Sequence, residues 1–246
     1  MNALTGKTAI VTGGSRGIGR AAVLRLASDG AAVLLTYRRD EAAARQVVDA
    51  VLARGGKASA MAFDLAHATE VERIFDEAEH QFGGVDILVN NAAEVNTPTI
   101  ADTTEAAWDR AFAVNAKAPF FLIQQAARRM RDDGRIINIS TITTALAEPG
   151  ASLYAGSKAA LEQVTRSAAW ELAPRRITVN AISPGATDTD LLHAVNPPEA
   201  LAQAVAMTPL GRLGLPADIA DLIAFLASPD ARWLTGQNIR ATGGLA

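Results

Sequence analysis

The feature that most constrains the fold of this chain is a regular alternation of short apolar runs with longer helical segments. Each run is rich in aliphatic or β-branched residues, and the segment after it has apolar residues at helical spacing. The runs are 8–11 (TAIV), 32–37 (AVLLTY), 59–63 (SAMAF), 86–90 (DILVN), 135–140 (RIINIS), 178–183 (TVNAIS) and 238–241 (NIRA). Short strands that are apolar throughout are typical of a parallel sheet with helices on both faces. The alternation therefore predicts a doubly wound α/β fold.

The helical segments between these runs end at glycine or proline. We expect helices over 19–28, 41–53, 69–82, 104–131 and 151–172. Gly30, Gly55, Gly83 and Pro174 follow four of them. Glycine can adopt the left-handed conformation that closes a helix, and proline cannot continue one, so these residues support the boundaries.

Length and composition favour one domain over two. The chain has 246 residues, of which 49% are hydrophobic, and no tract rich in proline, serine and glycine divides it. We therefore predict a single domain over 1–246. The stretch from about 186 to 215 breaks the alternation and contains Pro197, Pro198 and Pro209. It is predicted to be a mobile substrate lid, with a surface insertion as the alternative.

Charge and composition exclude several classes of function. The net charge of −3 and the scattering of the 23 basic residues disfavour nucleic acid or an anionic membrane as the partner. There is no cysteine, and the three histidines lack the spacing of metal ligands, so we expect no metal site. No apolar run approaches the ~20 residues that cross a membrane. These features predict a cytoplasmic protein that acts on a small molecule.

The glycine-rich turn TGGSRGIG, at 12–19, lies between the first predicted strand and the first helix. The residues expected to contact a ligand there are Gly13, Ser15, Arg16, Gly17, Ile18 and Gly19. Glycine lets the backbone approach a ligand closely, and the start of the following helix attracts phosphate. Its place after the first strand indicates a dinucleotide pyrophosphate site, although a purely structural tight turn is the alternative.

Basic residues stand where the cofactor's adenosine ribose is selected. In proteins that bind NAD, an acidic residue at the end of the second strand accepts hydrogen bonds from the ribose hydroxyls. Here the second strand is followed by Arg38 and Arg39, and Arg16 lies in the glycine turn. Guanidinium groups suit a 2′-phosphate, so we predict NADP(H) over NAD(H). The alternative is that the arginines are solvated and that Asp40 reaches the ribose.

Tyr154 and Lys158 are four residues apart on a predicted helix, so their side chains share a face. An ammonium group near a phenol lowers the phenol's pKa from about 10, which would make it a better acid-base catalyst. Such a pair can donate a proton to a carbonyl oxygen. In an arbitrary protein, a half-buried aromatic residue beside a surface lysine is the simpler interpretation.

The motifs occur together, in order and across nearly the whole chain. They are TGGSRGIG at 12–19, NNAA at 90–93, Asn115, the Ser-Thr pair at 140–141, YAGSK at 154–158, the Pro-Gly pair at 184–185 and a closing RLGLPADIADLIAFLAS…LTGQNIRATGG. Together they resemble the short-chain dehydrogenase/reductase family, and the closing stretch resembles its bacterial 3-oxoacyl-[acyl-carrier-protein] reductase branch. The resemblance implies a Rossmann-like domain with a seven-stranded parallel sheet, hydride transfer between NAD(P)(H) and an alcohol/carbonyl pair, and a homotetramer.

The resemblance also implies roles for single residues. Tyr154 would be the general acid in reduction, and Lys158 would lower its pKa and bind the nicotinamide ribose. Asn115 would hold a water that connects the lysine to solvent, with a purely structural asparagine as the alternative. Further cofactor contacts would come from Asp64, Leu65, Asn91, Ala92, Pro184, Gly185, Thr187 and Thr189.

The residue that orients the substrate carbonyl is less well defined by the resemblance. Related sequences with NISS use the second serine, and here NIST places Thr141 in that register, with Ser140 one residue earlier. Successive side chains of a strand point to opposite faces, so the choice matters. Threonine keeps the hydroxyl but adds a methyl group. We predict that Thr141 has the role and that Ser140 is the alternative.

These residues favour an NADP(H)-dependent reductase of ketones or 3-oxoacyl and β-ketoester carbonyls. Apolar residues of the lid are expected to line the substrate pocket, with a place in the core as the alternative. They are Leu191, Leu192, Val195, Leu201, Val205 and Met207. The competing hypothesis is a non-catalytic dinucleotide-binding or sensing protein, which the change to Thr141 motivates.

Overall fold

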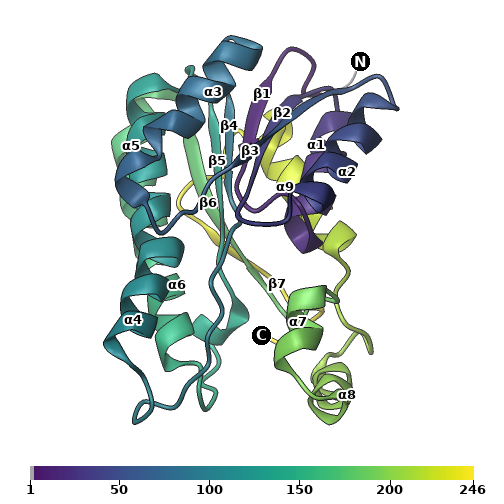
Figure 1. Ribbon diagram of the computed structural model, residues 1–246, viewed down its shortest axis with the longest axis vertical. Coiled ribbons are helices and arrows are strands. Elements are labelled where there is room, and N and C mark those ends of the chain that lie inside the picture. Colours follow the sequence, from purple (N-terminus) through teal and green to yellow (C-terminus); the bar gives the residue numbers. More distant parts are fainter. Residues whose placement is uncertain (1–2) are drawn as a thin grey trace.

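Seven parallel strands form one sheet in the order β3-β2-β1-β4-β5-β6-β7 in the computed structural model, which describes residues 3–246 (Figure 1). The strands are β1 (Thr8–Val11), β2 (Ala32–Tyr37), β3 (Lys57–Ala62), β4 (Ile87–Asn90), β5 (Arg135–Ile139), β6 (Thr178–Pro184) and β7 (Asn238–Ala241). Each neighbouring pair is parallel. The predicted single α/β domain with a seven-stranded parallel sheet is confirmed.

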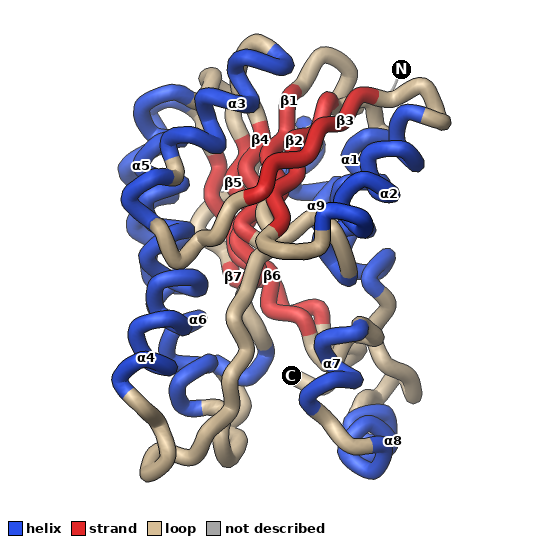
Figure 2. Tube along the Cα trace, viewed as in Figure 1, coloured by secondary structure: helices blue, strands red, loops and turns tan. Residues whose placement is uncertain are grey.

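Helices cover both faces of this sheet, as Figure 2 shows in blue against the red strands. One layer contains α1 (Gly17–Ser28), α2 (Glu41–Leu52) and α9 (Pro216–Ala227). The other contains α3 (Glu72–Phe82), α5 (Ala118–Arg129) and α6 (Ser152–Leu172), and α4 (Glu105–Phe112) precedes α5. Two layers of helices leave every central strand buried on both faces, which is why the central strands are rich in apolar residues.

The alternation of side chains along each strand divides the core into two clusters. Val33 and Leu35 of β2 belong to the cluster beneath α1, α2 and α9. Leu34, between them, belongs to the cluster beneath α3, α5 and α6, as does Ile10 of β1. Successive residues of a strand point to opposite faces, so each central strand supplies both clusters. The two cores hold the strand ends rigidly with respect to one another.

The order of the strands determines where a ligand can bind. The chain starts at β1 and builds outward to β3, and then returns to place β4 on the other side of β1. At this reversal, the connections leaving β1 and β4 run to opposite faces of the sheet and open a crevice at the carboxyl ends. The glycine turn follows β1, and the NNAA stretch follows β4. Both motifs are therefore brought to the same crevice.

The helix expected over 104–131 is interrupted, which corrects the prediction. After α4, one π-helical turn over Ala113–Lys117 precedes α5, and the backbone N–H of Ala118 donates to the carbonyl of Ala113. Pro119 has no N–H to donate to the carbonyl of Asn115, so a regular α-helix would lack a bond at this place. The wider turn occurs at the predicted functional residue Asn115, and such turns are frequent at functional sites.

The segment predicted as a lid contains two helices, α7 (Asp190–Val195) and α8 (Pro198–Met207). They lie between β6 and α9 in the chain, beyond the carboxyl ends of the strands (Figure 1). Every described side chain of α7 and α8 is at least partly exposed. The alternative that these apolar residues belong to the core is therefore wrong.

Among the described residues, no helix is long and apolar enough to cross a membrane.

Candidate active site and dinucleotide site

The glycine turn after β1 has the backbone geometry that only glycine adopts readily. Gly13 has a φ of +66° and Gly17 a φ of +53°. Asn91, just after β4, fixes the turn: its side-chain amide donates to the carbonyls of Thr12 (2.9 Å) and Gly13 (3.1 Å). The NNAA motif thus holds the glycine turn, which explains why two motifs far apart in the sequence occur together.

Space at the turn is too small for other side chains. A Cβ on Gly19 would lie 2.2 Å from the carbonyl oxygen of Gly13, and a Cβ on Gly13 would lie 2.9 Å from the Cα of Ala92. The turn leads into α1, whose first N–H groups are not capped by the side chain of Arg16. Uncapped N–H groups and the positive end of the helix dipole suit a phosphate. These residues fit the pyrophosphate of a dinucleotide.

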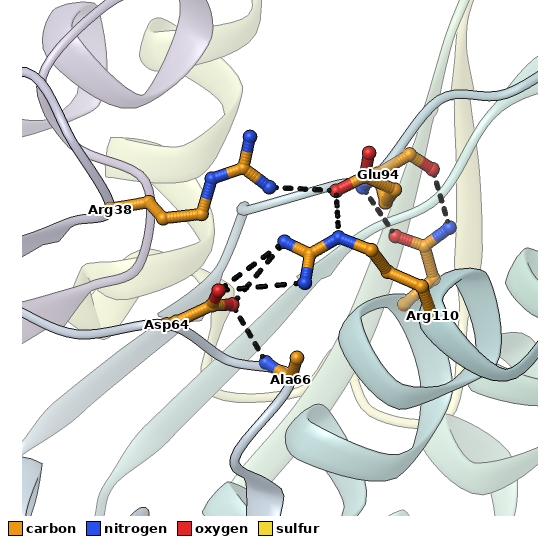
Figure 3. A network of polar contacts seen from close by, with 6 residues as sticks. Arg38, Asp64, Ala66, Glu94 and Arg110 are labelled. Atoms are coloured by element: carbon orange, nitrogen blue, oxygen red, sulfur yellow. Dashed lines mark hydrogen bonds and ion pairs between the residues drawn. The ribbon is translucent and has the colours of Figure 1, made fainter. Parts of the chain in front are cut away.

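Charged residues from three strand ends meet at the side of the crevice where the adenosine of a dinucleotide is expected (Figure 3). Arg38, after β2, forms an ion pair of 3.0 Å with Glu94, and Arg110 of α4 contacts both Glu94 (3.1 Å) and Asp64 (3.4 Å). Burial acts to raise the pKa of Asp64, but the Ala66 N–H and Arg110 outweigh it and hold that pKa below its usual value. Asp64 is therefore a carboxylate at neutral pH.

The other residues at the end of β2 have different surroundings. The carboxylate of Asp40 accepts a hydrogen bond of 2.9 Å from the N–H of Ala43 and caps α2. This use of Asp40 counts against the alternative that it binds the cofactor ribose. Arg16 and Arg39 are exposed, as is Arg38. Of the three predicted phosphate-binding arginines, only Arg38 forms an ion pair with the charge cluster, through Glu94.

Tyr154 lies at the start of α6, beside the end of β5. Burial raises the pKa of its phenol to about 12, and a hydrogen bond from Thr141 acts in the opposite direction. The expectation that the phenol has a lowered pKa is therefore wrong for this structure, because desolvation of the phenolate dominates. At neutral pH the phenol keeps its proton, which is the form that a general acid requires.

Lys158, one turn further along α6, is buried, with 1% of its surface exposed. Its Nζ donates a hydrogen bond of 2.8 Å to the carbonyl of Ile139 at the end of β5. Burial lowers the pKa of this ammonium group to about 8. Lys158 is thus the opposite of the solvated surface lysine of the simpler interpretation, and it is mostly charged at neutral pH.

The two hydroxyls after β5 point to different partners. The Thr141 hydroxyl hydrogen-bonds to the phenol of Tyr154 and lies 3.1 Å from the Thr143 hydroxyl. The Ser140 hydroxyl instead donates to Glu162 over 2.6 Å. This geometry supports Thr141 rather than Ser140 as the hydroxyl that faces a substrate carbonyl. The opposite orientations follow from the extended backbone between the two residues.

Asn115 links the π-helical turn to the segment after β4. Its side-chain oxygen accepts from the N–H of Glu94, and its side-chain amide donates to the carbonyl of Glu94, both over 2.8 Å. The amide also donates to the hydroxyl of Ser157, the residue before Lys158. The Asn115 side chain is fully buried, and all of these contacts are with protein groups. The geometry brings Asn115 close to the lysine, and its role in holding a water stays a prediction.

The predicted contacts after β6 lie beside the glycine turn. Gly185 follows β6, and a Cβ there would lie 3.1 Å from the Cα of Thr242. Thr187 hydrogen-bonds to the carbonyl of Gly185. Thr189 caps α7, and its methyl carbon lies 3.3 Å from where a Cβ of Gly17 would be. The start of the lid therefore touches the proposed pyrophosphate turn.

Sequence reasoning did not identify three charged residues of this region. Glu94 and Arg110 complete the charge cluster around Arg38 and Asp64. Glu162 accepts hydrogen bonds from the hydroxyls of Ser140 and Thr144 behind the site. Glu162 follows Lys158 at the spacing by which Lys158 follows Tyr154, and this repeated four-residue spacing could have identified it. Glu94 and Arg110 carry no such signal.

No group of three or more histidine, aspartate or glutamate side chains could hold a metal ion within the described range 3–246.

Comparison with known proteins shows similarity over nearly the whole chain. A family model described as enoyl-(acyl carrier protein) reductase matches residues 13–246. A hydroxynaphthalene reductase-like protein Arp2 of Metarhizium robertsii is 42% identical over 255 residues, which cover 98% of this chain and 95% of that protein. The structure of the angucycline C-6 ketoreductase LanV with bound NADP has a TM-score of 0.94 and 41% identity, and the match covers 99% of this chain and 97% of LanV. A blue fluorescent protein from a metagenomic library, in complex with NADPH, has a TM-score of 0.95 and 40% identity, with 99% of both chains covered.

The fold and the site together define an α/β oxidoreductase. The matches extend over nearly the whole chain, and the chain belongs to the short-chain dehydrogenase/reductase family. The family expected from the sequence motifs is thereby confirmed.

Proposed function

We propose that this protein reduces a ketone or a 3-oxoacyl or β-ketoester carbonyl to a secondary alcohol, reversibly and with NADP(H). The observation that carries the proposal is the arrangement on α6, where Tyr154 lies one turn before the buried Lys158, whose Nζ is fixed by the Ile139 carbonyl, and the phenol interacts with the Thr141 hydroxyl. When bound, a reduced nicotinamide supplies the hydride that the carbonyl carbon accepts.

The protein groups supply the proton and the orientation. Tyr154 is neutral at pH 7, so its hydroxyl can donate a hydrogen bond and then the proton to the carbonyl oxygen. Thr141 donates a second hydrogen bond to the same oxygen, and Lys158 stabilises the phenolate that forms. Asn115 holds the water that returns a proton to this pair. In oxidation of the alcohol, the same groups act in reverse.

The preference for NADP(H) is part of the proposal. Arg38 is the only one of the three arginines at the adenosine side that is anchored there, and Asp40 is occupied as a helix cap. NADP and NADPH are bound in two of the similar structures. A guanidinium at this place suits a 2′-phosphate.

A bulky apolar carbonyl compound is the proposed substrate class. Leu191, Val195 and Met207 in the lid have 38, 45 and 55% of their surface exposed, which leaves apolar area for a ligand. Two similar proteins are named for a hydroxynaphthalene and an angucycline. This supports a hydrophobic ketone over a short polar one.

The test is oxidation of NADPH and, separately, NADH, followed by absorbance. The panel contains bicyclic aromatic ketones, β-ketoesters, an acetoacetyl thioester and, because of the family model's description, an enoyl thioester. We expect NADPH consumption with a carbonyl substrate and its loss in Tyr154→Phe, which should still bind NADPH. Binding of NADPH without turnover of any compound would favour a non-catalytic dinucleotide-binding protein instead.

A homotetramer is the proposed assembly. Phe120 on α5 and Trp170 on α6 have 48 and 86% of their surface exposed, so the outer helix layer carries large apolar groups. Light scattering coupled to size-exclusion chromatography measures the mass directly. A mass of one chain over the micromolar range would contradict this assignment.

A further inference from the structure

The carboxylate of Glu94 occupies the centre of the charge cluster at the adenosine side. One oxygen, Oε2, lies 3.0 Å from Nη1 of Arg38 and 3.1 Å from Nε of Arg110 (Figure 3). Arg38 comes from the end of β2 and Arg110 from α4, so Glu94 joins two separate parts of the fold. The arginine assigned to the 2′-phosphate is therefore already bound to a protein anion.

The backbone of Glu94 is fixed beside the charge cluster. Its N–H and its carbonyl are both hydrogen-bonded to the side chain of Asn115, each over 2.8 Å. Asn115 is fully buried in the π-helical turn. Only the side chain of Glu94 is thus free to rotate, and 28% of that side chain is exposed.

The charges of the cluster are balanced before any ligand arrives. Arg38 and Arg110 supply two positive charges, and Glu94 and Asp64 supply two negative ones. A 2′-phosphate adds negative charge beside Arg38, where it competes with Glu94 for the guanidinium and is repelled by the carboxylate. A ribose that carries only hydroxyls does neither.

We propose that Glu94 is a specificity-determining residue whose carboxylate competes with the cofactor's 2′-phosphate for Arg38 and so limits the preference for NADP(H) over NAD(H). The proposal rests on the cofactor assignment of the proposed function. The expected effect is on the Kd values for NADPH and NADH.

The test compares wild type with Glu94→Gln, in which the side chain keeps its size and the backbone bonds to Asn115 are retained. NADPH and NADH are titrated separately by fluorescence without a carbonyl substrate. We expect the Kd for NADPH to fall about 3- to 10-fold, and the Kd for NADH to change less than twofold. Because one charge is removed, the effect on NADPH should shrink as salt is raised.

A double-mutant cycle connects the effect to Arg38. In an Arg38→Gln background, Glu94→Gln should lower the Kd for NADPH clearly less than in wild type, because the competition for Arg38 is gone and only the direct repulsion remains. Glu70→Gln is the matched control, since Glu70 forms an exposed ion pair with Arg73 and the substitution removes the same charge. We expect both Kd values of the control to equal those of wild type.

Several results would overturn the proposal. Weaker NADPH binding in Glu94→Gln would mean that the carboxylate prepares Arg38 for the phosphate. Equal changes for both cofactors, or an effect on NADPH of the same size without Arg38, would also contradict it. Each of these results leaves the proposed reductase activity intact, whereas wild type that fails to bind NADPH would refute both assignments.

Discussion

Replacement of Lys158 by methionine should remove activity and yet leave the protein at least as stable at neutral pH. Burial lowers the pKa of Lys158 from 10.5 to about 8. At about 1.4 kcal/mol for each tenfold change in the proton equilibrium, the folded protein carries a cost of about 3 kcal/mol for the charged form. Methionine has a similar shape without this charge.

The expected gain in the stability of Lys158→Met is reduced by the loss of one hydrogen bond. The carbonyl of Ile139 accepts from Nζ over 2.8 Å, and loss of a buried donor costs about 1–3 kcal/mol. We therefore expect Lys158→Met to be about 0–2 kcal/mol more stable than wild type at pH 7, measured by urea unfolding. Its kcat/KM for the carbonyl substrate should fall at least about 100-fold, since the phenolate of Tyr154 loses its partner.

The pH dependence of the unfolding free energy tests the effect of the buried charge more specifically than the stability at pH 7. Between the folded pKa of about 8 and the unfolded value of 10.5, the unfolded chain binds more protons at this lysine, so wild-type stability rises with pH relative to the variant. The difference between the two proteins should shift by about 2 kcal/mol in favour of wild type from pH 7 to 9.5. A difference that is constant over this range would refute the argument that the buried lysine is strained by its charge.

Three further predictions concern the turn, the hydroxyls and pH. Gly19→Ala should cost at least about 1–3 kcal/mol and weaken NADPH binding, because the added Cβ meets the neighbouring carbonyl, whereas Gly156→Ala, with open space in α6, should be neutral or stabilising in thermal unfolding. Thr141→Ala should lower kcat about 100-fold, and Thr141→Ser should retain much of the wild-type kcat. Ser140→Ala should change kcat far less, because the Ser140 hydroxyl is bonded to Glu162. A larger loss in Ser140→Ala than in Thr141→Ala would contradict the assignment of Thr141 as the hydroxyl that orients the carbonyl. The kcat/KM of reduction should decrease above pH 8 as Lys158 loses its proton, and a rate that is flat to pH 9.5 would show that its charge is not needed.

Much of the fold could be predicted because local and global preferences agree in this chain. The strand TAIV was expected at 8–11 and is found there, and the expected strand 32–37 has the same bounds as β2. Buried strands carry a continuous apolar signal, and glycines mark the ends of the helices between them. The break in the long helix before α5 was missed, since a π-helical turn has no periodicity of its own and only Pro119 indicated it.

The site was predictable where one short motif contains the whole geometry. Tyr154 and Lys158 lie on one helix at fixed spacing, so the sequence determines their common face. The pKa of Tyr154 was predicted in the wrong direction, because desolvation depends on distant residues that cover the phenol. Glu94 and Arg110 were missed for a similar reason. Three separate strand ends and α4 bring these charges together, and no spacing along the chain predicts that contact.

The exposure of α7 and α8 has a consequence for how such a chain can diverge. Their side chains belong to neither core cluster, so exchanging them changes the stability of the domain little. The groups proposed to donate the proton and to bind the dinucleotide lie on the strand ends and on α6, where most changes would be costly. Substitutions in this exposed segment can therefore accumulate at little cost to the fold, and a substrate preference that depends on it could change while the strand ends and α6 stay as they are.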